Sequence, residues 1–149
     1  MNKTIIFTSG SFDLFHFGHL NVLEKAKSKG DILIVGVSSD ELIKSYKGTY
    51  PIVNYKERAK IIEALKCVDV VVKQTKLVDI NQFKRLKASF FVLGDDWKTN
   101  FTNEGINWLR DNNKIIWIPY TKNLSTSEIK RKIIDNQEII KENLKLRNK

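Results

Sequence analysis

The two histidines of this chain, His16 and His19, lie three residues apart in one short stretch. An apolar run at residues 4–7 precedes them and predicts a short buried strand, and the apolar spacing at residues 20–26 favours one face of a helix. The start of such a helix offers unpaired backbone N–H groups and positive dipole character. Gly18, between the histidines, lets a ligand approach the backbone closely. These residue types predict a phosphate-binding site.

On these residues alone, two alternative roles for the histidines stay open. A chance strand, turn and helix with two helix-capping histidines would give the same pattern. A zinc site is a weaker hypothesis, because structural zinc needs four ligands. Cys67, the single cysteine, is distant in the sequence and lies in an apolar run typical of a small buried side chain. We therefore predict no protein-bound metal at the histidines.

Residues 11–19 closely resemble the G-T-F-D-x-x-H-x-G-H motif of the cytidylyltransferase family of nucleotidyltransferases, with Ser11 in the place of threonine. Three later segments resemble further motifs of the family. Arg58 with Val68–Asp69 resembles R-(x)n-V-D, and Leu124–Lys130 resembles I-S-T-[ST]-x-I-K. Gly94–Trp97 resembles the G-D-D-W of glycerol-3-phosphate cytidylyltransferases. The matches are collinear and span residues 4–132. Four motifs in this order make a chance match improbable.

The elements that must position these motifs alternate along the chain. Continuous apolar runs predict strands at 4–7, 32–37, 68–72, 89–93 and 115–118. Helical patterns lie between them at about 20–26, 41–46, 55–66, 77–86 and 104–110, and a last helix is expected at about 126–145. The expected helix starts are at residues 38–40, at Asn54, at Asn103 or Glu104, and at Ser125 or Thr126. This alternation predicts a doubly wound α/β fold with a five-stranded parallel sheet, whose ligands lie beyond the carboxyl ends of the strands. The resemblance implies a Rossmann-like nucleotidyltransferase fold with strand order 3-2-1-4-5.

Composition excludes several classes of protein. The 149 residues fit one domain, 1–149, and no apolar run approaches the roughly 20 residues of a membrane span. No secretory signal precedes the first strand, so we expect a cytoplasmic protein without membrane insertion. The formal charge is +9, but the lysines are scattered and form no basic block with aromatic residues. We therefore expect no nucleic-acid partner, and a surface that suits nucleotides and sugar phosphates.

The resemblance implies a reaction. A cytidylyl group would pass from CTP to a small polyol phosphate, with glycerol 3-phosphate as first choice, giving CDP-glycerol, a precursor of cell-surface polysaccharide or teichoic acid, and pyrophosphate. The attacking phosphate is already ionised, so positioning and cationic donors should dominate. We expect Mg²⁺ to accompany the nucleotide. The alternatives are an adenylyltransferase that uses ATP and a non-catalytic nucleotide-binding module. The family is commonly dimeric, and residues 58–70 are a plausible contact for a homodimer.

The resemblance also assigns roles to residues. The catalytic group would be His16, His19 and Lys47, with the protonation of the histidines left open. The nucleotide would be bound by Ser11, Phe12, His16, Phe17, Gly18, His19, Lys47, Asp95, Tyr120, Thr121, Lys122, Ser125, Thr126 and Ser127. The acceptor would be bound by Asp13, Lys44, Arg58, Asp96 and Trp97.

Several of these residues have a structural alternative. Asp13 either caps the turn or holds Mg²⁺ or a histidine. A one-residue insertion before Arg58 leaves the match of Lys44 and Lys47 to the family's two lysines unsettled, and either lysine alone is also explained as an ordinary solvated side chain. Arg58 is explained by an ion pair as well as by support of the site. The pair of aspartates at 95–96 is equally compatible with a turn, and Trp97 with simple packing.

One segment departs from the family pattern. Where the family usually reads R-T-x-G-I-S-T, this chain has Tyr120 in the place of arginine and Asn123 in the place of glycine. Asparagine tolerates left-handed backbone geometry, so the turn is expected to survive. Tyrosine cannot replace the bidentate charge of arginine, and Lys122 is the nearest candidate to supply it. Without such a substitute, phosphate binding is expected to be weaker.

Overall fold

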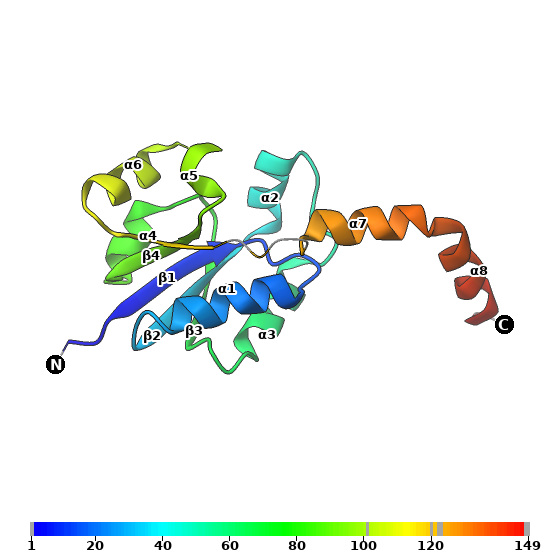
Figure 1. Cartoon of the computed structure of the whole chain (residues 1–149), viewed down its shortest axis with the longest axis horizontal. Coiled ribbons are helices and arrows are strands. Elements are labelled where there is room, and N and C mark those ends of the chain that lie inside the picture. The colour runs from blue at the N-terminus through cyan, green and yellow to red at the C-terminus, as the bar shows by residue number, and fades with distance from the viewer. Residues whose placement is uncertain (1, 101, 120, 122–123, 148–149) are drawn as a thin grey trace.

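The computed structural model describes residues 2–100, 102–119, 121 and 124–147. Five parallel strands form one sheet in the order β3-β2-β1-β4-β5, which confirms the expected order (Figure 1). The strands are β1 (Ile5–Gly10), β2 (Ile32–Ser38), β3 (Val70–Gln74), β4 (Phe90–Gly94) and β5 (Ile115–Ile118). Strand order reverses at β1, between β2 and β4, so the carboxyl end of β1 lies at the crevice where ligands of doubly wound folds bind.

Eight helices lie within the described residues. They are α1 (Phe17–Lys27), α2 (Asp40–Lys47), α3 (Tyr55–Glu63), α4 (Ile80–Arg85), α5 (Trp97–Asn100), α6 (Glu104–Asp111), α7 (Thr126–Asp135) and α8 (Gln137–Arg147). Helices α1 and α3 cover one face of the sheet, and α4 and α6 cover the other. The expected caps are present, because Ser39, Asn54, Asn103 and Ser125 each accept a backbone N–H in the first turn of the following helix. The short helix α5 was not predicted, because four residues are too few for a periodic pattern.

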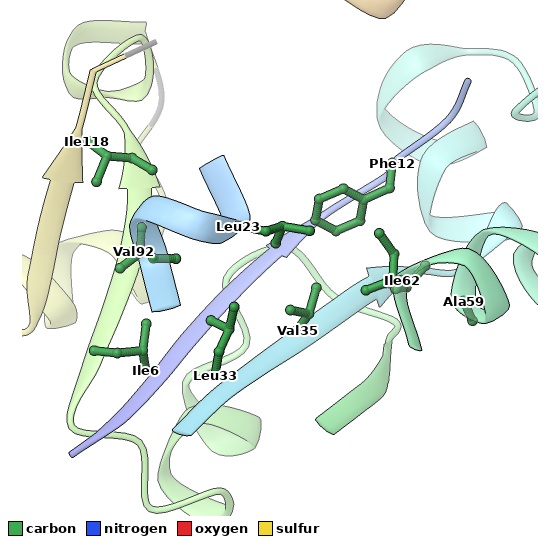
Figure 2. Packing of buried hydrophobic residues seen from close by; sticks show 11 residues of the cluster. Ile6, Phe12, Leu23, Leu33, Val35, Ala59, Ile62, Val92 and Ile118 are labelled. Carbon is green, nitrogen blue, oxygen red and sulfur yellow. The ribbon is translucent and has the colours of Figure 1, made fainter. Parts of the chain in front are cut away.

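Alternate residues of the strands pack into two cores on opposite faces. On one face, Ile6 and Leu33 pack with Leu23 of α1 and Ile62 of α3 (Figure 2). On the other face, Phe7, Ile34 and Phe91 pack with helices α4 and α6. Both faces of every central strand are therefore buried, which explains why the strands read as unbroken apolar runs.

The expected helix at about 126–145 is wrong as a single element, because Asn136 divides it into α7 and α8. At Asn136 the backbone has φ −104° and ψ 15°, and the side-chain amide donates to the carbonyl of Lys132. Such local bonds of asparagine compete with helical pairing. Neither α7 nor α8 contains a buried residue, and α8 projects away from the sheet (Figure 1). Within the described ranges, every helix is too short or too polar to cross a membrane.

Candidate functional site

A cavity of about 340 Å³ opens at the carboxyl ends of the strands. Residues from the loops after β1, β2, β3 and β4 and from the start of α7 line it, and these segments are far apart in the sequence. Many of the residues expected to bind substrates lie together here, namely Ser11, Phe12, His16, Gly18, His19, Lys47, Asp96, Trp97, Thr121, Ser125, Thr126 and Ser127. Three of the four motifs named above, those at residues 11–19, 94–97 and 124–130, therefore meet at this cavity, whereas the motif of Arg58 with Val68–Asp69 does not line it.

Other residues expected at the site do not line the cavity. Phe17 is exposed at the start of α1, and Lys44 is exposed with its ammonium group 4.3 Å from the centre of the Tyr50 ring. Asp95 follows β4, where its backbone N–H donates to Ile118. Asp13 and Arg58 are buried behind the loop. Tyr120 and Lys122 lie outside the described residues. The expectation that Lys122 supplies the charge of the missing arginine therefore stays a prediction.

The two histidines cap α1 reciprocally. Nδ1 of His16 accepts the backbone N–H of Gly18, and Nδ1 of His19 accepts the backbone N–H of His16. The rings stack with their centres 3.9 Å apart. Gly18 is needed because a Cβ there would lie 2.8 Å from Cε1 of His16. The histidines thus cap the helix and also line the cavity. Their capping role is compatible with the proposed role in phosphate binding.

Both histidines are held in the neutral form. Burial lowers the pKa of His16, and burial, together with the charges of His16 and Lys47, lowers the pKa of His19 to about 4. Since each Nδ1 accepts a backbone N–H, the ring proton of each neutral histidine lies on Nε2. Nε2 of His16 is buried and has no hydrogen-bond partner among the described residues. The pair therefore presents Nε2–H donors, which suit an anion without adding charge.

The loop between β1 and α1 has a strained backbone. Phe12 and Leu14 have φ of 51° and 49°, a left-handed conformation that is rare for bulky residues. Between them, the carboxylate of Asp13 accepts the backbone N–H groups of Ile52 and Val53 at 3.0 and 2.9 Å. These bonds favour the cap-like role for Asp13 that the sequence left open. Strain of this kind persists only where the surroundings impose it.

Lys130 of α7 is a second partner of the Asp13 carboxylate. Its Nζ lies 3.6 Å from Oδ2 of Asp13. Burial acts to raise the pKa of Asp13, but the two backbone donors and Lys130 outweigh it and lower that pKa. Lys130 also lies near Lys47, whose pKa is lowered by burial first and by Lys130 next. The first loop and the last motif are therefore coupled through one carboxylate.

Arg58 holds three loops together from behind the cavity. Its side chain is fully buried and forms an ion pair of 2.6 Å with Asp40. It also donates to the carbonyls of Val53, Ser11 and Ser38. These carbonyls belong to the segment before α3, to the loop after β1 and to the last residue of β2. The structure thus gives Arg58 a supporting position rather than one on the cavity surface.

Several polar residues of the cavity were missed by sequence reasoning. They are Thr8 and Ser9 of β1, Ser38 of β2, Gln74 of β3 and Tyr46 of α2. Their signal was weak: each serine, threonine or glutamine lies at the end of an apolar strand, and such a residue is equally typical of a strand terminus. Burial raises the pKa of Tyr46, while the hydroxyls of Ser11 and Ser38 beside it act to lower it.

The described residues contain no group of three or more histidine, cysteine, aspartate or glutamate side chains that would hold a metal ion. Asp96 is the carboxylate among the described residues that line the cavity. Burial and the neighbouring Asp95 raise the pKa of Asp96, so a cation beside it would be stabilising. Mg²⁺ typically takes most of its oxygens from phosphates and water, with only one or two carboxylates. The site fits a magnesium ion that arrives with a nucleotide.

Known proteins are similar to this chain in sequence. The family model described as Cytidylyltransferase-like matches residues 7–133. Glycerol-3-phosphate cytidylyltransferase from Bacillus spizizenii is 38% identical over 134 residues, which cover 88% of this chain and 96% of the relative. The protein of that name from Bacillus subtilis is 36% identical over 141 residues, 89% of this chain and 98% of the relative. The bifunctional protein HldE of Helicobacter pylori is 49% identical over 96 residues, 64% of this chain but 21% of that protein.

Solved structures share the fold. A lipopolysaccharide core biosynthesis protein from Thermoplasma volcanium superimposes with a TM-score of 0.69 and 25% identity, covering 81% of this chain and all of that one. A putative nicotinate-nucleotide adenylyltransferase from Vibrio parahaemolyticus gives a TM-score of 0.63 at 15% identity, covering 91% of this chain and 89% of that one. At that identity the likeness concerns the fold alone.

Proposed function

The chain belongs to the cytidylyltransferase-like family and is a nucleotidyltransferase, and we propose that it transfers the cytidylyl group of CTP to glycerol 3-phosphate. The products are CDP-glycerol and pyrophosphate. The relatives of that name, similar over nearly their whole length, support the choice of substrates.

The observation that carries the proposal is the pair of neutral histidines beside Lys47. The buried Nε2 of His16 lacks an acceptor among the described residues, and a phosphate oxygen in the cavity supplies one. The start of α7 also lines this cavity, through Thr126 and Ser127, and a helix start of this kind favours an anion. Uncharged donors and one lysine bind a triphosphate without repelling one another. This arrangement favours phosphoryl chemistry over the acid–base chemistry of a titrating histidine.

The residues of the chain then act by positioning and by stabilising charge. An oxygen of the acceptor phosphate attacks the α-phosphorus of CTP, the new P–O bond forms, and the bond to the β-phosphate oxygen breaks to release pyrophosphate. His16, His19 and Lys47 donate hydrogen bonds to the oxygens on which negative charge develops. The attacking phosphate is ionised at neutral pH, so no side chain needs to remove a proton. Asp96 would be the carboxylate of the cavity that holds an accompanying Mg²⁺, which would supply neutralisation of phosphate charge.

The test is pyrophosphate release by the purified protein with CTP or ATP and glycerol 3-phosphate. We expect release with CTP, with CDP-glycerol as the second product. Release with ATP but not with CTP would instead identify an adenylyltransferase. No release with either nucleotide, despite nucleotide binding, would identify a non-catalytic module. His16→Ala serves as the inactive control, and Ser28→Ala, a change at an exposed hydroxyl that bonds to Lys25, serves as the active one.

We also propose that the enzyme is a homodimer in contact through residues 58–70. Ile61 and Val70 of this segment are 42% and 44% exposed and give it apolar surface. Covering them by a second copy would remove apolar surface from water. Sedimentation at micromolar concentration should give twice the mass of the 17.3 kDa chain, and a monomer mass would contradict the proposal.

A further inference from the structure

One side of the cavity is built from polar side chains that none of the four motifs contains. They lie at the carboxyl ends of three neighbouring strands: Ser9 is the penultimate residue of β1, Ser38 ends β2 and Gln74 ends β3. All three line the cavity. Gly36 of β2 pairs with Ser9, and a Cβ at Gly36 would lie 3.1 Å from Cβ of Ser9. The glycine therefore keeps clear the space beside the Ser9 side chain.

A directed chain of hydrogen bonds links these side chains. The hydroxyl of Ser38 donates to Oε1 of Gln74 at 2.8 Å, and Nε2 of Gln74 donates to Oγ of Ser9 at 2.9 Å. The hydroxyl of Ser9 acts as an acceptor in this chain and keeps its own O–H to donate. Ser38 acts as a donor, and with the Tyr46 hydroxyl beside it one of its two lone pairs is left to accept. One donor and one acceptor thus remain for a ligand, in positions that the amide of Gln74 determines.

The network lies at a place where polar groups are costly. Gln74 and Ser38 are each 1% exposed. A buried amide costs free energy unless it is hydrogen-bonded, and an aliphatic side chain would pack against the core without that cost. Both amide atoms of Gln74 are hydrogen-bonded, so the amide offsets this cost by fixing the hydroxyls of Ser9 and Ser38 at the cavity.

The other side of the cavity has a different character. There the lining comes from β4 and the segment after it, with Leu93 and the indole of Trp97 beside Asp96. A flat apolar wall of this kind suits a planar base. The loop with the histidines lies between the two sides, since β1 is the central strand. Two substrates that meet at the histidines would thus occupy opposite sides.

We propose that Ser9, Ser38 and Gln74 form the subsite for the hydroxyl groups of the acceptor, with Gln74 as the residue that sets selectivity. The inference rests on the proposed function and deepens it: the acceptor is a small phosphomonoester whose carbon chain carries free hydroxyls. A hydroxyl both donates and accepts, and it matches the donor of Ser9 and the acceptor of Ser38. Lys47, at the end of α2, lines the same cavity, where the proposed reaction has it donate to phosphate oxygens of the nucleotide.

The experiment compares glycerol 3-phosphate with propyl phosphate, which has the same carbon chain without hydroxyls. The variants are Gln74→Met, which removes both amide bonds, and Ser9→Ala, which removes one hydroxyl and leaves the core unchanged. Gln137→Met, on exposed α8, is the matched control. The wild type should prefer glycerol 3-phosphate in kcat/KM by about 100-fold, and each cavity variant should reduce that preference by about 10-fold. The KM for CTP should change less than about twofold in both.

Binding of the two phosphates, measured by calorimetry, separates this inference from the proposed reaction. A wild type that turns over CTP but accepts both phosphates equally would overturn the subsite and leave the reaction standing. Tighter binding of glycerol 3-phosphate that Gln74→Met and Ser9→Ala abolish, without any pyrophosphate release, would support the subsite and contradict the reaction. Equal losses with both acceptors, or a selective rise in the KM for CTP, would also overturn the subsite.

Discussion

The loop between β1 and α1 and the pair of C-terminal helices differ in how the rest of the chain holds them. The loop is tied by hydrogen bonds to Arg58, to the backbone at Ile52 and Val53, and to Thr126. In α7 and α8 no residue is buried, and Ile134 is 65% exposed. The contrast shows where the long-range contacts of the fold lie: they constrain the strained backbone of the site and leave the helices beyond Lys130 to their local sequence.

The largest expected effect comes from the main support of the loop. Arg58→Met should lower the free energy of unfolding by about 3–5 kcal/mol, because it breaks a buried ion pair and leaves three carbonyls without their donor. Urea unfolding measures this change. Arg131→Met is the matched control, since the Arg131–Glu128 pair of α7 is exposed, and it should leave the unfolding midpoint unchanged. Equal effects of the two substitutions would remove the contrast between the regions.

The histidines should matter more for turnover than for stability. His16→Ala and His19→Ala should each lower turnover by a factor on the order of 100 or more, because donors to the transition-state charge are lost. His16→Asn separates the two roles, because asparagine is a good N-cap but lacks a donor in the place of Nε2. It should keep the stability of the wild type and lose its turnover. Near-normal turnover in the alanine variants would show that the cavity is not the active site.

Acid should weaken the loop through the histidines. The pKa of His19 is about 4 in the folded protein, against about 6.5 when unfolded, so between these values the unfolded state binds more protons. Stability therefore falls as the pH decreases through this window, by about 2 kcal/mol from pH 7 to pH 5. The pKa of Asp13 is lowered in the folded protein, so its contribution to stability is lost only below about pH 4. His19→Gln should flatten the dependence, measured by unfolding at each pH, and an unchanged slope would show that another group carries it.

The smallest effect should come from the C-terminal helix. A chain that ends at Asn136 lacks α8 and should differ in unfolding free energy by less than about 0.5 kcal/mol, with turnover unchanged, because α8 buries no side chain. Thermal melts and pyrophosphate release test this together. A much less stable or inactive shortened protein would mean that α8 packs against a partner, and the contrast with the loop would then hold only for the isolated chain.

Much of this molecule was determined by patterns that are local in the sequence. Apolar runs placed the five strands, and Ser39, Asn54, Asn103 and Ser125 marked helix starts that the structure confirms. The histidine motif located the cavity, because the end of a parallel strand and the start of its helix are neighbours in both sequence and space. The roles of Tyr120 and Lys122 stay predictions.

Only the tertiary structure decided the rest. The partners of Asp13 lie 39 and 40 residues along the chain, and the amide of Gln74 reaches a serine 65 residues away. The break at Asn136 is local instead, with a side-chain bond four residues back, and periodicity missed it because the apolar spacing continues across it. Periodicity and caps are read from neighbouring residues, whereas the hydrogen bonds of Asp13 and Gln74 exist only once the sheet has brought the ends of separate strands together.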